Sequence, residues 1–240
     1  MEAVMKILGA FQRSVTLNAF EFFSEVALSE VTAHSGVQRP FESKTDFYVL
    51  IECECETTAE EDNILAIFEQ CMESGWALDG TMSQSRAQAS ALWRCREDIS
   101  ETIAQYTPYK NDISVTVSKV PEFLMRVERL IKSEYPDFRI VWFGHIGDGN
   151  VHLNILKPDD LSIESFVSKC ETVSPKVFEI VRTFGGSISA EHGVGLLKKK
   201  YLNYSRSPSD VTMMQGIKQT FDPHGILNPG KIFESVSKDA

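Results

Sequence analysis

The chain has 240 residues, of which 42% are hydrophobic and 24% are charged, a balance typical of a soluble globular protein with one sizeable core or two small ones. The net charge of −10 argues against a nucleic-acid partner, since phosphate binding would need a basic surface. No apolar run is long enough to cross a bilayer, no basic signal sequence follows Met1, and an odd count of five cysteines argues against a disulfide framework. We therefore expect a reducing, cytoplasmic location.

The first third of the chain alternates helical and extended patterns. Apolar residues at helical spacing predict a helix over residues 2–15, and LNAFEFFSEVAL predicts a strand over 17–28. DFYVLIECE predicts a strand over 46–54, and a helical pattern over 62–73 ends before Gly75. This order favours an α+β fold, in which helices pack on one face of a mainly antiparallel sheet.

A long helix is predicted from Ser83 to Gln105. Arg96 and Ser100 are four residues apart, so they share one face of that helix and can point at one ligand. The alternative is a solvated Arg96 that pairs with a neighbouring glutamate. A turn and a second helix, over residues 121–132, lead on to the centre of the chain.

The sequence GHIGDGNVHLN, residues 144–154, lies between two runs of strand-forming residues. Asp148-Gly149 is a preferred pair for a two-residue hairpin turn, and that turn would place His145 opposite His152. Directly opposed residues have Cβ atoms roughly 4.5–5.5 Å apart, close enough for two imidazoles to bind one divalent cation. Asn154 follows on the same face. The alternative is a hairpin with two surface histidines.

A second segment, ISAEHGVG over residues 188–195, brings a carboxylate beside a histidine. Residues 187–189 are predicted as a short strand, and the glycines around Glu191-His192 allow the backbone to bend sharply. Glu191 can supply a third, anionic ligand and leave an open position for substrate. Two nitrogens and one carboxylate suit zinc, manganese or iron. The alternative for Glu191 is a carboxylate at the start of a helix.

Three motifs in order carry a family resemblance: GHIGDGNVHLN, SISAEHGVG and FDPHGILNPGKIF (residues 221–233), preceded by DGTMSQSRAQASALWRCRE and PYKNDISV. The chain resembles the C-terminal half of FAD-linked oxidases of the vanillyl-alcohol oxidase type, most closely those that oxidise D-2-hydroxyglutarate and D-lactate. The resemblance implies a ferredoxin-like cap domain over residues 1–221 and a tail over residues 222–240 that lies against a flavin domain. It also implies that the N-terminal FAD-binding domain of about two hundred residues has no counterpart in this chain.

The resemblance further implies the role of each site residue. Substrate binding falls to Arg96, Ser100, Lys110 and Asn154, where Ser100 stands in place of the threonine of many relatives. A zinc or manganese ion would be held by His145, His152 and Glu191, with His192 as the base that takes the substrate hydroxyl proton. Asn228 would lie near the flavin. Hydride would pass from the substrate to FAD, so the chain alone is expected to have no turnover.

The expected partners are therefore a small anionic 2-hydroxy acid, a flavin-binding domain or chain and an electron acceptor, and a homodimer is left open. Two readings of another class also stay open. A metal-dependent hydrolase could use the same ligands to activate water. A non-catalytic binding module would keep the motifs as structure only.

Overall fold

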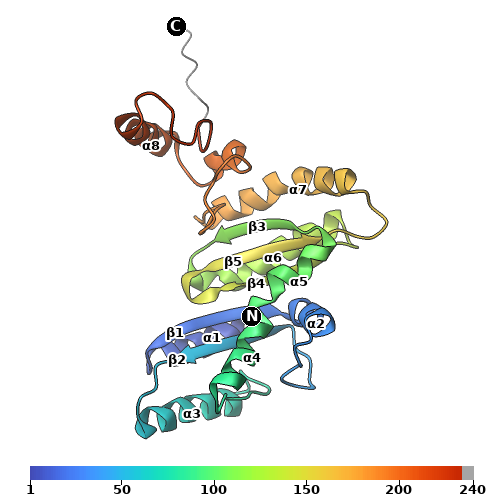
Figure 1. The fold of residues 1–240 in the computed structure, drawn as a ribbon, viewed down its shortest axis with the longest axis vertical. Helices are drawn as coiled ribbons and strands as arrows, with labels where there is room; N and C mark the ends of the chain where they lie inside the picture. Colours follow the sequence, from blue (N-terminus) through green and yellow to red (C-terminus); the bar gives the residue numbers. More distant parts are fainter. Residues whose placement is uncertain (234–240) are drawn as a thin grey trace.

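The structure, a computed structural model, describes residues 1–233 and consists of a five-stranded sheet in the order β2-β1-β4-β5-β3 (Figure 1). Every neighbouring pair of strands is antiparallel. The α+β class with an antiparallel sheet is therefore confirmed. The strands are β1 (Leu17–Ser24), β2 (Phe47–Cys53), β3 (Tyr109–Ser114), β4 (Arg139–His145) and β5 (Asn150–Leu156).

Side-chain caps set two element boundaries that apolar spacing does not reveal. The strand predicted over 17–28 ends at Ser24, whose side chain accepts a hydrogen bond from Ala27 N and begins a helix. Another helix begins at Thr58, because Thr57 and Glu60 form a reciprocal capping box. The α-helices of the described residues are α1 (Glu2–Gln12), α2 (Glu25–His34), α3 (Thr58–Glu73), α4 (Arg86–Glu97), α5 (Ile99–Thr102), α6 (Val120–Glu134), α7 (Ile163–Thr183) and α8 (Pro208–Phe221).

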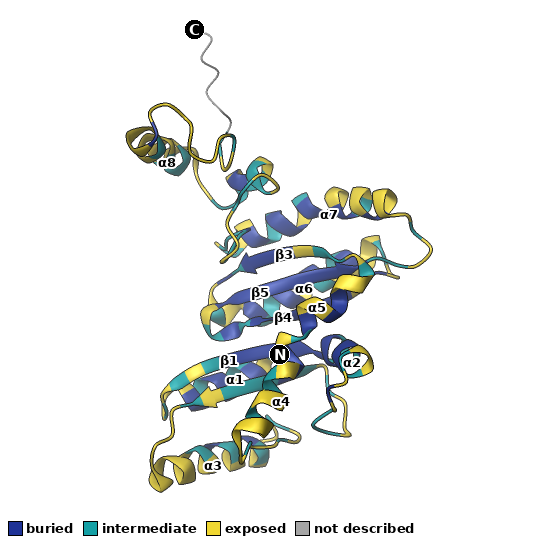
Figure 2. Ribbon diagram, in the orientation of Figure 1, coloured by how far each residue is buried: buried dark blue, intermediate teal, exposed yellow. Residues whose placement is uncertain are grey.

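Helices pack on both faces of the sheet, although the larger share lies on one face. The main core joins α1, α3, α6 and α7 to strand residues such as Phe22, Trp142 and Leu153. Alternate strand residues, among them Phe23 and Phe143, face the other way and pack against α2, α4 and α5. This second layer covers only part of its face (Figure 2). The polar residues of the predicted site lie on that same face.

The long helix predicted from Ser83 to Gln105 is wrong, because it is divided into three short pieces. Helix α4 ends at Glu97, α5 follows from Ile99, and the 3-10 helix η1 spans Ile103–Tyr106. Arg96 is 9% exposed, whereas Ser100 is exposed to solvent. The buried side chains Cys95 and Ile99 hold α4 and α5 on the smaller core. The break therefore keeps Arg96 inside while Ser100 faces outward.

The two-residue turn predicted at Asp148-Gly149 is also wrong. Phe143, not His145, pairs with His152, and the connection is a longer one that contains the 3-10 helix η3 (Ile146–Asp148). Gly149 closes that turn at φ 72°, where an added Cβ would lie 2.0 Å from the Val115 carbonyl oxygen. The longer connection fully buries Ile146 in the main core. Burial of Ile146 thus favours this loop over a tight turn.

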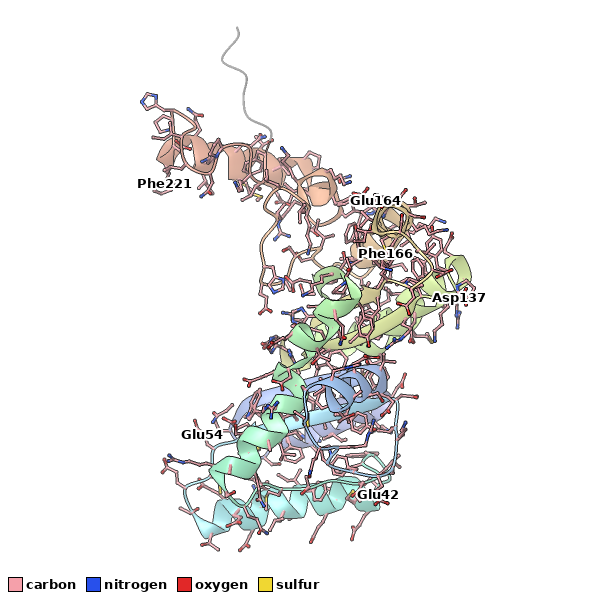
Figure 3. The ribbon with its side chains drawn as sticks, turned by 45° about the vertical axis from the view of Figure 1, so that its right-hand side comes forward. Glu42, Glu54, Asp137, Glu164, Phe166 and Phe221 are labelled. Atoms are coloured by element: carbon pink, nitrogen blue, oxygen red, sulfur yellow. The ribbon has the colours of Figure 1, made fainter. Side chains whose placement is uncertain are left out.

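The predicted strand at 187–189 is reduced to one bridge between Ser114 and Ser187. Beyond it, the 3-10 helix η4 (Lys199–Tyr204) and α8 lead away from the body of the domain (Figure 1). Phe221 is 79% exposed at the end of α8, whereas Phe166 on α7 is 1% exposed (Figure 3). Within residues 1–233, no helix has both the length and the apolar character needed to span a membrane.

Candidate metal and substrate site

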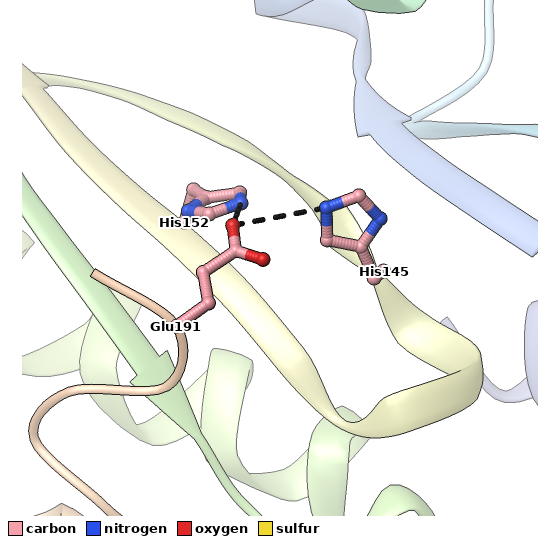
Figure 4. A group of neighbouring side chains, drawn as sticks. All are labelled: His145, His152 and Glu191. Carbon is pink, nitrogen blue, oxygen red and sulfur yellow. Dashed lines mark ion pairs between the residues drawn. The ribbon is translucent and has the colours of Figure 1, made fainter. Parts of the chain in front are cut away.

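Two histidines and a carboxylate from three segments meet on the less covered face of the sheet (Figure 4). His145 ends β4, His152 lies within β5, and Glu191 comes from the loop after α7. Glu191 Oε1 lies 3.4 Å from His152 Nε2 and 3.8 Å from His145 Nε2. The three ligand atoms all lie within 4.8 Å of one another. The convergence predicted from the two motifs is therefore present.

Glu21 of β1 lies behind His145 and is 5% exposed. Its Oε1 atom and His145 Nδ1 are hydrogen-bonded at 2.7 Å, and its Oε2 atom lies 3.0 Å from Arg96 Nε in an ion pair. The hydrogen bond with the Glu21 carboxylate raises the pKa of His145. The Arg96 guanidinium also lies 4.7 Å from the centroid of the Phe143 ring, a cation–π contact. Burial lowers the pKa of Arg96 despite the opposing charge of Glu21.

His152 is 7% exposed, and this burial lowers its pKa to about 4. Its ring is therefore neutral near pH 7, which is the form that binds a metal ion. The Nδ1 atom lies 3.7 Å from Oδ1 of Asp112, a residue of β3 that pairs directly with His152 across the sheet. The other ring nitrogen, Nε2, faces Glu191 Oε1.

Asp112 also holds the loop that carries Glu191 and His192. Its Oδ2 atom accepts hydrogen bonds from Glu191 N at 2.9 Å and from His192 N at 2.8 Å. Burial raises the pKa of Asp112, but these two backbone donors outweigh that effect and the pKa is lowered. Lys198 Nζ donates to the carbonyl oxygens of Asp112 and Ile188, which ties the same loop to β3 a second time.

The remaining predicted site residues differ in how close they lie to this centre. The His192 ring stacks on His152 with centroids 5.6 Å apart, and its Nε2 atom lies 3.7 Å from Glu191 Oε1. Asn154 is buried on β5 and pairs across the sheet with the exposed Lys110 of β3. Asn228 is exposed in the C-terminal tail, with φ 46°.

The donor set fits a divalent cation. Ligands at about 2.0–2.1 Å in tetrahedral geometry lie about 3.4 Å apart, close to the separations around Glu191 Oε1. A carboxylate behind each histidine is the usual outer contact of a metal-binding imidazole. Glu21 stands behind His145 in this way, and Asp112 stands behind His152 at a longer distance.

Glu21 and Asp112 were missed in the sequence, although both leave a signal there. Each is an acidic residue within a strand pattern, in AFEFF and in NDISV. An acidic side chain is almost never fully buried unless it is paired. A carboxylate on a strand with large apolar neighbours therefore predicts a buried basic or donor group beside it, and here those groups are Arg96, His145 and the loop backbone.

The fold is shared with about half of a larger oxidase. A solved structure of 4-ethylphenol oxidase from Gulosibacter chungangensis, in complex with isoeugenol, superposes with a TM-score of 0.59 at 13% sequence identity, over 91% of this chain and 48% of that one. The chain belongs to the family "FAD linked oxidases, C-terminal domain", whose model matches residues 1–232.

Two curated relatives carry the same name, D-2-hydroxyglutarate dehydrogenase. The protein from Stutzerimonas stutzeri (strain A1501) is 56% identical over 232 residues, which cover 97% of this chain and 50% of the relative. The protein from Xanthomonas citri pv. viticola is 50% identical over 234 residues, which cover 98% of this chain and 49% of the relative. The chain thus spans about half the length of the curated relatives it matches.

Proposed function

We propose that the chain is the substrate-binding part of an FAD-linked dehydrogenase that oxidises a D-2-hydroxy acid, D-2-hydroxyglutarate or D-lactate, to the 2-oxo acid. The observation that carries this proposal is the convergence of His145, His152 and Glu191 beside the buried Arg96. The relatives named D-2-hydroxyglutarate dehydrogenase support the substrate class. A cytoplasmic location stays a prediction.

The carboxylate of the hydroxy acid would bind Arg96, Lys110 and Asn154. Arginine offers a planar pair of donors to a carboxylate, and lysine adds a point charge. Asn154 Nδ2 is buried with no hydrogen-bond partner among the described residues, as expected of a donor reserved for a ligand. Ser100 would contribute a hydroxyl at the outer edge of the site, because its side chain is exposed.

His145, His152 and Glu191 would hold a zinc or manganese ion beside the substrate. When bound, such an ion lowers the pKa of a coordinated hydroxyl and fixes its orientation. His192 would take the proton of the 2-hydroxyl group as the hydride leaves C2. Its exposure of 64% lets it pass that proton on to solvent. FAD, carried by a separate domain or chain, would accept the hydride.

The C-terminal arm, which consists of residues 196–233, supports a flavin domain as the partner. Its exposed side chains include Leu197, Met213, Ile217, Phe221 and Ile226. Large apolar surfaces that protrude together commonly mark an interface. We assign this surface, together with Asn228, to contact with the flavin domain, in line with the expectation for residues 222–240. Residues 234–240 of that tail lie outside the described residues.

The proposal is tested by metal and ligand binding on the purified chain. After treatment with a chelator, the chain should bind a single Zn²⁺ or Mn²⁺ ion, and His152→Ala should abolish that binding. D-2-hydroxyglutarate or D-lactate should then raise the unfolding temperature of the metal-loaded chain more than the L enantiomers do. Lys110→Met should reduce this shift and leave metal binding in place, because Lys110 is assigned to the substrate carboxylate and not to the ion.

Other results would contradict the proposal. Hydrolysis of esters or amides by the metal-loaded chain would favour the hydrolase. If the chain binds no ion and hydroxy acids do not raise its unfolding temperature, a non-catalytic module would be favoured. Reduction of a dye by the chain and free FAD would show that no further flavin domain is required.

A further inference from the structure

The buried carboxylate of Glu21 lies between two groups of different chemistry. On one side is His145 Nδ1, 2.7 Å from Oε1, and on the other is Arg96 Nε, 3.0 Å from Oε2. Arginine can only donate hydrogen bonds, whereas each ring nitrogen of a neutral histidine either donates or accepts one. An ionised carboxylate only accepts. Between these neighbours, Glu21 therefore forces His145 to carry its proton on Nδ1.

The position of that proton decides whether His145 can bind a metal ion. With the proton on Nδ1, the lone pair is on Nε2, which faces Glu191 Oε1 at 3.8 Å. With the proton on Nε2, an N–H would face the ion and the ring could not bind it. The hydrogen bond on the far nitrogen of a metal-binding histidine sets this choice.

We infer that Glu21 is a positioning residue that fixes the tautomer of His145, and that Arg96 makes this choice strict by placing its positive charge 3.0 Å from the second carboxylate oxygen. The inference rests on the proposed metal site. It adds a second role for Arg96. Besides binding the substrate carboxylate, Arg96 orients the His145 ring through Glu21.

Glutamine in place of Glu21 should therefore be the more harmful of two neutral replacements. The positive charge of Arg96 would attract the amide oxygen of the glutamine and so turn its NH₂ group toward His145 Nδ1. That nitrogen would then have to accept, and the proton would move to Nε2. Methionine has a similar length but neither accepts strongly nor donates, so it leaves the ring free to adopt either tautomer.

The test compares Zn²⁺ affinity by competition with a chelator in the full chain and in three variants. Glu21→Gln should bind Zn²⁺ about 10- to 100-fold more weakly than the unmodified chain, the usual loss when an outer-shell partner is wrong. Glu21→Met should lose less affinity than Glu21→Gln. Glu54→Gln removes the same charge at an exposed position just beyond the end of β2 and should leave the Zn²⁺ affinity unchanged (Figure 3).

A second readout does not depend on metal. In nitrogen-15 NMR spectra of the metal-free chain, at a pH where the ring is neutral, His145 should be the Nδ1–H tautomer, and Glu21→Gln should convert it to the Nε2–H tautomer. Thermal unfolding of each variant identifies any loss of fold. A purely electrostatic or structural role predicts instead that Gln, the closer isostere, does no worse than Met, and that result would overturn the inference.

The two proposals can fail separately. If the unmodified chain binds no Zn²⁺, the proposed metal site is wrong, and the tautomer of His145 in Glu21→Gln still decides the role of Glu21. If the chain binds Zn²⁺ and Glu21→Gln leaves both the affinity and the tautomer unchanged, Glu21 does not set the tautomer and the metal site stands.

Discussion

The two halves of the site are held in very different ways. His152 and Asn154 lie on β5, where all seven residues are buried and the strand pairs with neighbours on both sides. Glu191 and His192 lie on an exposed loop, held chiefly by hydrogen bonds to Asp112 and by Lys198. The core therefore positions the histidines of the sheet, whereas a single carboxylate positions most of the loop.

The site residues on β5 should lose their positions only when the core unfolds. Leu153 is fully buried between His152 and Asn154 but points into the main core. Leu153→Ala should lower the free energy of unfolding by about 2–5 kcal/mol, measured by urea denaturation. Ile163→Ala, at a position 51% exposed, should cost less than about 0.5 kcal/mol. Equal costs for the two variants would contradict the burial of β5.

The loop that carries Glu191 and His192 should lose its position in a variant that still folds. Asp112→Ala removes the acceptor of two backbone N–H groups, so it should cost about 1–3 kcal/mol of stability and weaken Zn²⁺ binding about 10- to 100-fold. Faster hydrogen exchange at the amides of Glu191 and His192 would locate the effect. Asp210→Ala serves as the control, because the Asp210 carboxylate on α8 also accepts a hydrogen bond from a backbone N–H group, that of Ser207. Its Zn²⁺ affinity should be unchanged. Unchanged exchange in Asp112→Ala would show that other contacts hold the loop.

The smallest effect is expected at low pH, away from both halves. Burial raises the pKa of Glu25, but hydrogen bonds from Arg39, Tyr48 and Ser29 outweigh it and lower the pKa from 4.5 to about 2. A lowered carboxyl pKa stabilises the fold above pH 4.5, and that stability is lost as the pH falls toward 2.

The size of this contribution is about 1 kcal/mol, because solvent screens a partly exposed pair. Urea denaturation across this pH range should show a steeper loss of stability for the unmodified chain than for Glu25→Gln. Parallel curves for the two proteins would contradict the assigned pKa.

The sequence predicted the partners of the site better than the path of the chain between them. The hairpin register was wrong by two residues, yet side chains alternate with a period of two along a strand, so His145 and His152 still share a face. An error of one residue would have separated them. The alternation of side chains along a strand is a local property, so it can be predicted from the sequence. The length of the loop depends instead on where Ile146 is buried.

Tertiary contacts account for what the sequence did not indicate. Neither a glycine nor a proline marks the break after Glu97, which follows the packing of Cys95 and Ile99 on the smaller core. The pairing of Glu21 with His145 joins residues 124 positions apart. Spacing within a motif cannot reveal such a contact, although the buried acidic residue indicates that some partner exists.

The protruding C-terminal arm has a practical consequence for work in solution. Side chains such as Leu197 and Phe221, 86% and 79% exposed, give an isolated preparation a surface through which molecules adhere to one another. Light scattering over a dilution series should therefore precede any titration, because self-association at high concentration would imitate or mask the binding of a small ligand.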